Sequence, residues 1–240
     1  MNHTLTIAKR ELSALFFSPV AYLVLGVFAF IATGFFVYAT FGEGQPAELR
    51  AEFSMIVFVL AFIAPAISMR LLSEELRSGT IELLMSAPVN DTQVILGKWA
   101  GAMVFYLALL VPMLIHVLVL ETVADPDYGP IFSGLLGLVL VGALYLAIGV
   151  AVSAATDSQL VAYLITVLII GMLTIGVSLI VSAEWAAPGL VNALYYVNVN
   201  QQYADFAKGL IDTSHFVFFL SGTALALFVA VLILQSKRWR

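Results

Sequence analysis

The residues with the most chemical capacity are gathered in one polar segment, Arg70 to Trp99. The chain as a whole is 62% hydrophobic, yet this segment carries seven of its 25 charged residues. Charges, helix breakers and a short apolar helix in one loop favour the docking of a protein partner over catalysis. The seven are Arg70, Glu74, Glu75, Arg77, Glu82, Asp91 and Lys98.

A short helix is predicted inside this segment, over Thr80–Ala87. Gly79 interrupts the preceding helical pattern, the Thr80 hydroxyl can cap the new helix, and Pro88 prevents its continuation. The apolar side chains of this helix need a cover, which is either the membrane domain itself or a groove on a cytoplasmic partner. They are Leu83, Leu84 and Met85.

Other chemistry is missing from the sequence. The one Gly-Lys pair, Gly97-Lys98, is followed by Trp99 and belongs to no phosphate-binding loop. There is no cysteine, and a net charge of −5 gives no basic footprint for nucleic acid. His116, the one histidine inside an apolar run, is expected to be a hydrogen-bonded packing residue. We therefore expect no catalytic residue, cofactor or metal in this chain.

The elements that must hold this loop are membrane spans. A mean hydropathy of +1.06 places the chain in the membrane class. Six runs approach or exceed the roughly 20 apolar residues that cross a bilayer, and none contains a charged residue. The fold class expected is an all-α membrane protein with a single domain over residues 1–240. The runs are Pro19–Phe41, Phe53–Met69, Trp99–Leu120, Ile131–Ala155, Gln159–Val181 and Phe216–Leu234.

Basic residues are sorted by side. Eight of the ten lie with the two termini and the Arg70–Lys98 loop, whereas Arg50 and Lys208 lie opposite. The positive-inside rule therefore predicts a multi-pass protein with both termini in the cytoplasm. Acidic residues lean outward, and Glu52 is assigned to an outer loop over Gly42–Glu52.

Shorter elements flank the spans. Residues 1–18 form either an interfacial helix or a frayed tail, and 182–215 form either two short amphipathic outer helices or an ordinary loop. The predicted apolar face of the first helix consists of Leu5, Ala8, Leu12, Leu15 and Phe16.

Several residues should shape the spans. Pro65 and Pro112 should kink the second and third spans, either as packing features or as gating hinges. Gly97 and Gly101 allow another helix to approach closely. Thr156 or Asp157 is expected to cap the fifth span.

The polar loop resembles the signature of ABC-2 type transporter permeases. The matching pattern is Arg70, the Glu74-Glu75 pair, Gly79-Thr80, the Glu82-Leu83-Leu84 turn, Pro88, and then Gly97-Lys98. The layout of spans and short helices is also similar to that family. Residues 203–212 resemble the gliding-motility-type branch, which also contains permeases linked to copper-enzyme maturation.

The resemblance implies an assembly in a prokaryotic inner membrane. Two permease chains pair as a homodimer or heterodimer, surrounded by membrane lipid. Each docks a cytoplasmic ATPase, which binds ATP and Mg, through the coupling helix Thr80–Ala87 in the loop 70–98. Glu82, Leu83, Leu84 and Pro88 would contact the ATPase or shape the helix, with Gly79 and Thr80 as its turn and cap. An extracytoplasmic accessory protein is a further implied partner.

Two functions remain open. The chain is either a permease that exports or moves an unidentified substrate, or a mechanotransmission or scaffold subunit that relays ATPase motion to an extracytoplasmic partner without passing a solute. A polar lumen between paired spans would favour transport, whereas a dry, closed seam would favour mechanotransmission. The candidate lumen residues are Thr33, Tyr38, Ser68, Tyr106, Tyr145 and Thr174.

Overall fold

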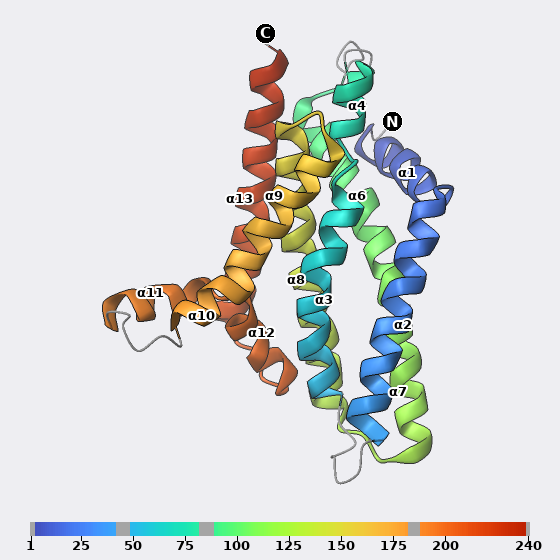
Figure 1. Cartoon of the computed structure of the whole chain (residues 1–240), viewed down its shortest axis with the longest axis vertical. Coiled ribbons are helices and arrows are strands. Elements are labelled where there is room, and N and C mark those ends of the chain that lie inside the picture. Colours follow the sequence, from blue (N-terminus) through green and yellow to red (C-terminus); the bar gives the residue numbers. More distant parts are fainter. Residues whose placement is uncertain (1–2, 42–48, 82–88, 182–187, 239–240) are drawn as a thin grey trace.

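The computed structural model describes residues 3–41, 49–81, 89–181 and 188–238, and all regular elements in these ranges are helices. Six helical segments among them are long and apolar enough to cross a membrane, which confirms the expected all-α fold and its six spans. Figure 1 shows both termini at the same end of the bundle. The spans are α2 (Pro19–Phe41), α3 (Arg50–Ser68) with α4 (Ser73–Ser78), α6 (Asp91–Leu109) with α7 (Val111–Val123), α8 (Tyr128–Ala155), α9 (Gln159–Gly171) with its continuation, and α13 (Thr213–Arg238).

Helix α8 is the centre of the bundle. It is the most buried of the candidate spans. Helices α3, α6, α9, α12 and α13 all pack against it. Its glycines permit this closeness: a Cβ at Gly142 would overlap the Tyr106 ring of α6, and one at Gly149 would overlap the Ser68 hydroxyl of α3. Without an aqueous driving force between spans, such close packing is a main source of association.

The third span is interrupted where its proline predicts. Helix α6 ends at Leu109 and α7 begins at Val111, with Pro112 in the first turn of α7. Proline has no N–H to donate to the preceding turn, so the regular ladder stops there. Pro65 behaves differently, because α3 continues past it to Ser68. A gating role for either proline stays a prediction.

The fifth span contains an irregularity that hydropathy did not predict. After α9 the chain forms a π-helical turn, η1 (Met172–Gly176), before α10 (Val177–Val181). The amide of Asn200 donates to the Thr174 carbonyl at 3.4 Å, and that of Asn198 donates to the Ser178 hydroxyl at 2.8 Å. Polar side chains of the following segment thus contact the π-helical turn and the start of α10.

The expected cap of this span was wrong. The side chain of Ser158 accepts from the Val161 N–H at the start of α9. Thr156 is instead the C-cap of α8, and its hydroxyl accepts from the Ser158 N–H at 3.2 Å. Ser158 is the residue whose extended backbone directly precedes the first helical turn, so its oxygen, and not that of Asp157, reaches the free amide.

Two short helices lie between the fifth and sixth spans, as predicted: α11 (Pro188–Val197) and α12 (Val199–Ala207). Figure 1 shows α11 extending away from the bundle, whereas α12 returns to it. The Tyr203 hydroxyl of α12 donates to the Gly134 carbonyl of α8 at 3.2 Å. The Ser133 hydroxyl of α8 donates to the Phe206 carbonyl of α12 at 2.6 Å.

Helix α1 (His3–Phe16) packs along α6. A Cβ at Gly97 would lie 2.8 Å from the Ile7 side chain, and one at Gly101 would lie 2.8 Å from the Ala8 carbonyl oxygen. The predicted close approach is confirmed, and the approaching helix is α1. Leu5 of the predicted apolar face is 55% exposed, and Glu11 lies against Gly101 on the face that packs on α6. The position of α1 at the membrane interface stays a prediction.

This packing predicts opposite outcomes for two glycine-to-alanine changes. Gly101→Ala forces a methyl group against the backbone of α1 and should lower stability by about 1–3 kcal/mol. Gly26→Ala in α2 meets open space and should be neutral or stabilising, because alanine is the better helix former. Thermal unfolding in mild detergent measures both; equal effects would contradict the close contact between α1 and α6.

Candidate functional site

The predicted coupling loop begins on a well-ordered base. Helix α4 ends in Gly79, which has a left-handed φ of 72° that other residues rarely adopt. The Thr80 hydroxyl lies 2.8 Å from the Ser78 hydroxyl, and Ile81 is buried. The turn role of Gly79 fits this geometry, while the predicted cap role of Thr80 stays a prediction. Glu82, Leu83, Leu84 and Pro88 lie outside the described residues, so their roles also stay predictions.

A buried lysine joins this base to two other helices. The side chain of Lys98 in α6 is 2% exposed. Its Nζ lies 3.0 Å from Glu11 Oε2 of α1 and 2.9 Å from Glu75 Oε1 of α4. A buried charge is tolerated only when it is paired and hydrogen-bonded, so both carboxylates must stay in place. We call Lys98, Glu11 and Glu75 the lysine clamp.

Sequence reasoning placed Lys98 in the loop signature and missed its burial. A signal was present: Lys98 lies between two residues of a small-residue contact stripe, Gly97 and Gly101, where a second helix should approach. A lysine so close to that stripe has to find its counter-ions on the approaching elements. Glu11, on the inner face of α1, was assigned no role.

A serine of the central helix fixes the same base. The Ser153 hydroxyl accepts from the N–H groups of Leu72 and Ser73, each at 3.0 Å, and donates to the Met69 carbonyl at 3.0 Å. The turn between α3 and α4 is therefore pinned to α8. Since the lysine clamp also ties α4 to α1 and α6, a displacement of α4 is resisted by three helices at once.

Arg70 adds a contact at the N-terminal end of α2. Its Nη1 donates to the Ser18 hydroxyl at 2.8 Å, between α1 and α2. The residues of the polar segment before Gly79 thus contact the membrane domain through hydrogen bonds. None of these contacts resembles an acid, base and nucleophile set, and they hold helices in place.

A second buried polar pair lies nearer the opposite end. Glu52 Oε1 lies 2.6 Å from His116 Nδ1, and His116 Nε2 lies 3.1 Å from the Thr33 hydroxyl. The ring of Phe36 stacks on His116 at 4.4 Å. The assignment of Glu52 to an outer loop was wrong: it lies in α3 and is 1% exposed, because helix α3 begins at Arg50 and His116 supplies its partner. His116 is a hydrogen-bonded packing residue, as expected.

Four of the six candidate lumen residues lie inside the chain's own core. Ser68, Tyr106, Tyr145 and Thr174 are fully buried, and the Tyr106 hydroxyl donates to the Leu138 carbonyl at 2.7 Å. Tyr38 on α2 is 80% exposed. The four buried side chains therefore do not line a path between paired chains in this conformation.

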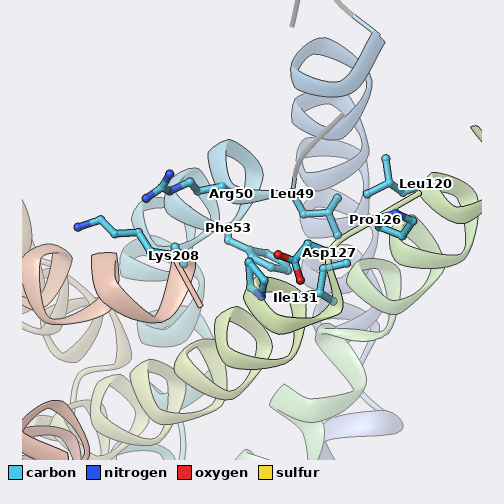
Figure 2. Close-up of a pocket in the computed structure, with 10 residues that line it drawn as sticks. Leu49, Arg50, Phe53, Leu120, Pro126, Asp127, Ile131 and Lys208 are labelled. Carbon is cyan, nitrogen blue, oxygen red and sulfur yellow. The ribbon is translucent and has the colours of Figure 1, made fainter. Parts of the chain in front are cut away.

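A small pocket of about 150 Å³ lies between the start of α3, the α7–α8 connection and the end of α12. Figure 2 shows Arg50 and Lys208 at its rim, with both side chains extending away from Phe53 and Ile131. Lys208 Nζ lies 2.8 Å from Asp205 Oδ1; this bond and one from His215 hold the pKa of the Asp205 carboxyl below its usual range. The pocket brings together the two basic residues assigned to the outer side.

No metal-binding group of three or more His, Cys, Asp or Glu side chains occurs in the described ranges. The helices of these ranges position three polar features: the lysine clamp, the Ser153 pin and the Glu52–His116 pair. The first two surround the base of the predicted coupling loop, and the third stabilises the packing of α2, α3 and α7.

The lysine clamp predicts a large cost for losing its cation. Lys98→Met leaves two carboxylates facing each other without a counter-charge, and stability should fall by about 3–5 kcal/mol. Lys9→Met, on the exposed side of α1, is the matched control and should stay within about 0.5 kcal/mol. Thermal unfolding of the purified variants measures the difference; a similar stability for both would show that the clamp does not hold the helices.

The Glu52–His116 pair is tested by a double-mutant cycle. Glu52→Leu and His116→Leu each leave one buried polar group without its partner and should destabilise. The double change removes both, so its cost should be smaller than the sum by about 0.5–3 kcal/mol. Additive costs in the same unfolding assay would mean that the two side chains do not interact.

The chain matches a family model described as ABC-2 family transporter protein over residues 12–235, which is nearly its whole length. No curated protein sequence matches it. The matched range includes the lysine clamp apart from Glu11, the base of the loop, five of the candidate spans and the sixth except for its last two residues. The chain therefore belongs to the ABC-2 family of transporter membrane proteins.

Proposed function

We propose that the chain is the permease subunit of an ABC-2 transporter. In this role it couples ATP hydrolysis by a separate cytoplasmic ATPase, which holds ATP and Mg, to the movement of an unidentified substrate. The observation that supports this most is the lysine clamp, which ties the base of the predicted coupling loop to α1 and α6. The sequence carries no phosphate-binding motif of its own.

The coupling helix Thr80–Ala87 is the proposed contact with the ATPase. Its Leu83 and Leu84 side chains would enter a groove on the partner, as amphipathic helices do. Glu82 would lie at the edge of that contact, and Pro88 would end the helix. The left-handed turn at Gly79, which ends α4 just before this helix, supports the proposed start of the coupling helix at Thr80.

Motion would pass from this helix through α4. The Ser153 pin transmits displacement of α4 to the central helix α8, and the lysine clamp transmits it to α1 and α6. Because these contacts are buried and paired, breaking one costs more than moving the connected helices together. We propose that the helices rock as a unit, with Pro65 and Pro112 as hinges.

The proposed setting is a prokaryotic inner membrane with both termini in the cytoplasm, following the distribution of basic residues. A second permease chain, identical or different, completes the assembly. The two least buried spans are α2 and α9 with its continuation, which are available for contact with lipid or with that chain. Membership of the gliding-type branch and an extracytoplasmic accessory protein belong to the same proposal.

A mechanotransmission role is the second candidate. The observation that favours it is the burial of Ser68, Tyr106, Tyr145 and Thr174 inside the chain, which leaves these polar groups unavailable for a lumen. In that case the motion passed on through α4 would move an extracytoplasmic partner. Solute flux in vesicles containing the whole complex would separate the two functions.

The ATPase contact is tested by co-purification from the native membrane. Leu83→Glu combined with Leu84→Glu should reduce recovery of a Walker-type ATPase by about tenfold or more, because two charges cannot enter an apolar groove without cost. Thr6→Glu, at an exposed position of α1 outside its predicted apolar face and at the same end, should leave recovery unchanged. Undiminished recovery with the double variant, in normal amounts of inserted chain, would contradict the coupling-helix proposal.

A further inference from the structure

An apolar groove runs along the outside of the bundle between α9 and α13, with α8 as its floor. It encloses about 610 Å³, within the range of sites that hold small molecules, about 300–1,000 Å³. Of the 16 residues that line it, Thr156 is the only one with a polar side chain. Gly222 deepens it, because an added Cβ there would lie 3.0 Å from Leu144 of the floor.

The groove is long enough for an extended hydrocarbon chain. It follows α13 from Phe218 to Ile233, which is about 22 Å at the rise of an α-helix. That length covers much of a hydrocarbon core of about 30 Å. The groove lies between two candidate spans that are mostly unburied, so its surroundings at this depth are lipid or another membrane chain.

One end of the groove adjoins a polar pocket of about 300 Å³. Phe218 lines both spaces, and Val197 of the groove directly follows Tyr195 and Tyr196 of the pocket. The pocket is lined by hydroxyl, amide, carboxyl and imidazole groups from α11, α12 and the start of α13. Its polar residues are Tyr195, Tyr196, Gln201, Gln202, Asp205, Ser214 and His215.

The polar groups of this pocket are held in place by one another. Asp205 Oδ2 lies 3.1 Å from His215 Nε2, and His215 Nδ1 is hydrogen-bonded to the Gln202 side chain. Gln202 also donates to the Tyr196 carbonyl at 2.9 Å. No lysine or arginine is among the described residues that line the pocket, and Asp205 is already paired, through Oδ1 with Lys208 and through Oδ2 with His215. The rings of Tyr195 and Tyr196 remain, and aromatic ring faces attract an ammonium group.

We propose that the groove and the pocket together bind one zwitterionic phospholipid. Its acyl chain lies in the groove between α9 and α13, and its ammonium-bearing headgroup lies in the pocket formed by α11, α12 and α13. A continuous apolar channel that ends in a polar chamber matches an amphipathic ligand with a tail and a head. This site is separate from the coupling loop and does not depend on the proposed ATPase contact.

The tail contact is tested with a photoactivatable phosphatidylethanolamine. The full chain, with its native partners, is reconstituted in vesicles containing this lipid with a diazirine in the acyl chain. After illumination, mass spectrometry should find label concentrated on the groove-lining parts of α8, α9 and α13. Label spread evenly over all lipid-facing surfaces would overturn the proposal, because it would show only bulk contact.

Two alanines of α13 provide a matched pair. Ala226 lines the groove, whereas Ala224 is exposed and does not line it. Ala226→Trp should fill the groove and reduce its labelling about tenfold, while Ala224→Trp should leave labelling at the wild-type level. Equal labelling of the two variants would overturn the proposal. If Ala226→Trp fails to insert, the wild-type labelling pattern alone decides.

The headgroup and the competing occupant are tested separately. Tyr195→Leu, which removes an aromatic ring from the pocket, should lower groove labelling by phosphatidylethanolamine, and a phosphatidylglycerol probe of the same acyl chain should label the wild-type groove more weakly. Equal labelling by both probes would overturn the ammonium assignment. Because the chain has no cysteine, Leu225→Cys introduces a unique thiol at the groove. Efficient oxidative cross-linking of two such chains would show that a second copy occupies it, and would overturn lipid binding.

Discussion

The ammonium group of Lys98 is buried and needs counter-ions, and the structure at the end with both termini depends on this constraint. A buried cation is tolerated only beside anions, so Glu11 and Glu75 must meet it from two directions. One carboxylate comes from α1 and the other from α4, which fixes an N-terminal helix and the base of a loop on the same span. The glycines Gly97 and Gly101 allow this by letting α1 approach the backbone of α6.

Other buried polar contacts also hold pairs of helices together. Ser153 holds the α3–α4 turn on α8, and the Glu52–His116 pair connects α3 to α7 nearer the opposite end. Between these points the spans touch through apolar side chains and the glycines of α8. Apolar contacts specify little direction in lipid, so buried polar pairs give these helices their register.

The sequence predicted the spans well because the thickness of a bilayer sets the length of an apolar run. It also predicted the close approach at Gly97 and Gly101 and the interruption near Pro112, since both follow from the local properties of glycine and proline. It placed Glu52 wrongly because a charge marks a loop by composition, while its burial depends on His116, 64 residues away. The burial of Lys98 likewise depends on distant partners, Glu11 and Glu75, although its place between Gly97 and Gly101 indicated a close helix contact. The π-helical turn of the fifth span is bound by Asn198 and Asn200 at the start of α12, a contact that no local pattern contains.

The central claim is that α1 and α4 move as one body when the ATPase changes state. Since the chain has no cysteine, spin labels can be placed uniquely at two exposed positions, Lys9→Cys on α1 and Glu74→Cys on α4. Pulsed electron–electron double resonance on the reconstituted complex then measures the distance between them with and without nucleotide. The account predicts one distance distribution in both states. A distribution that shifts when ATP binds would contradict it, because the lysine clamp would then open during the cycle.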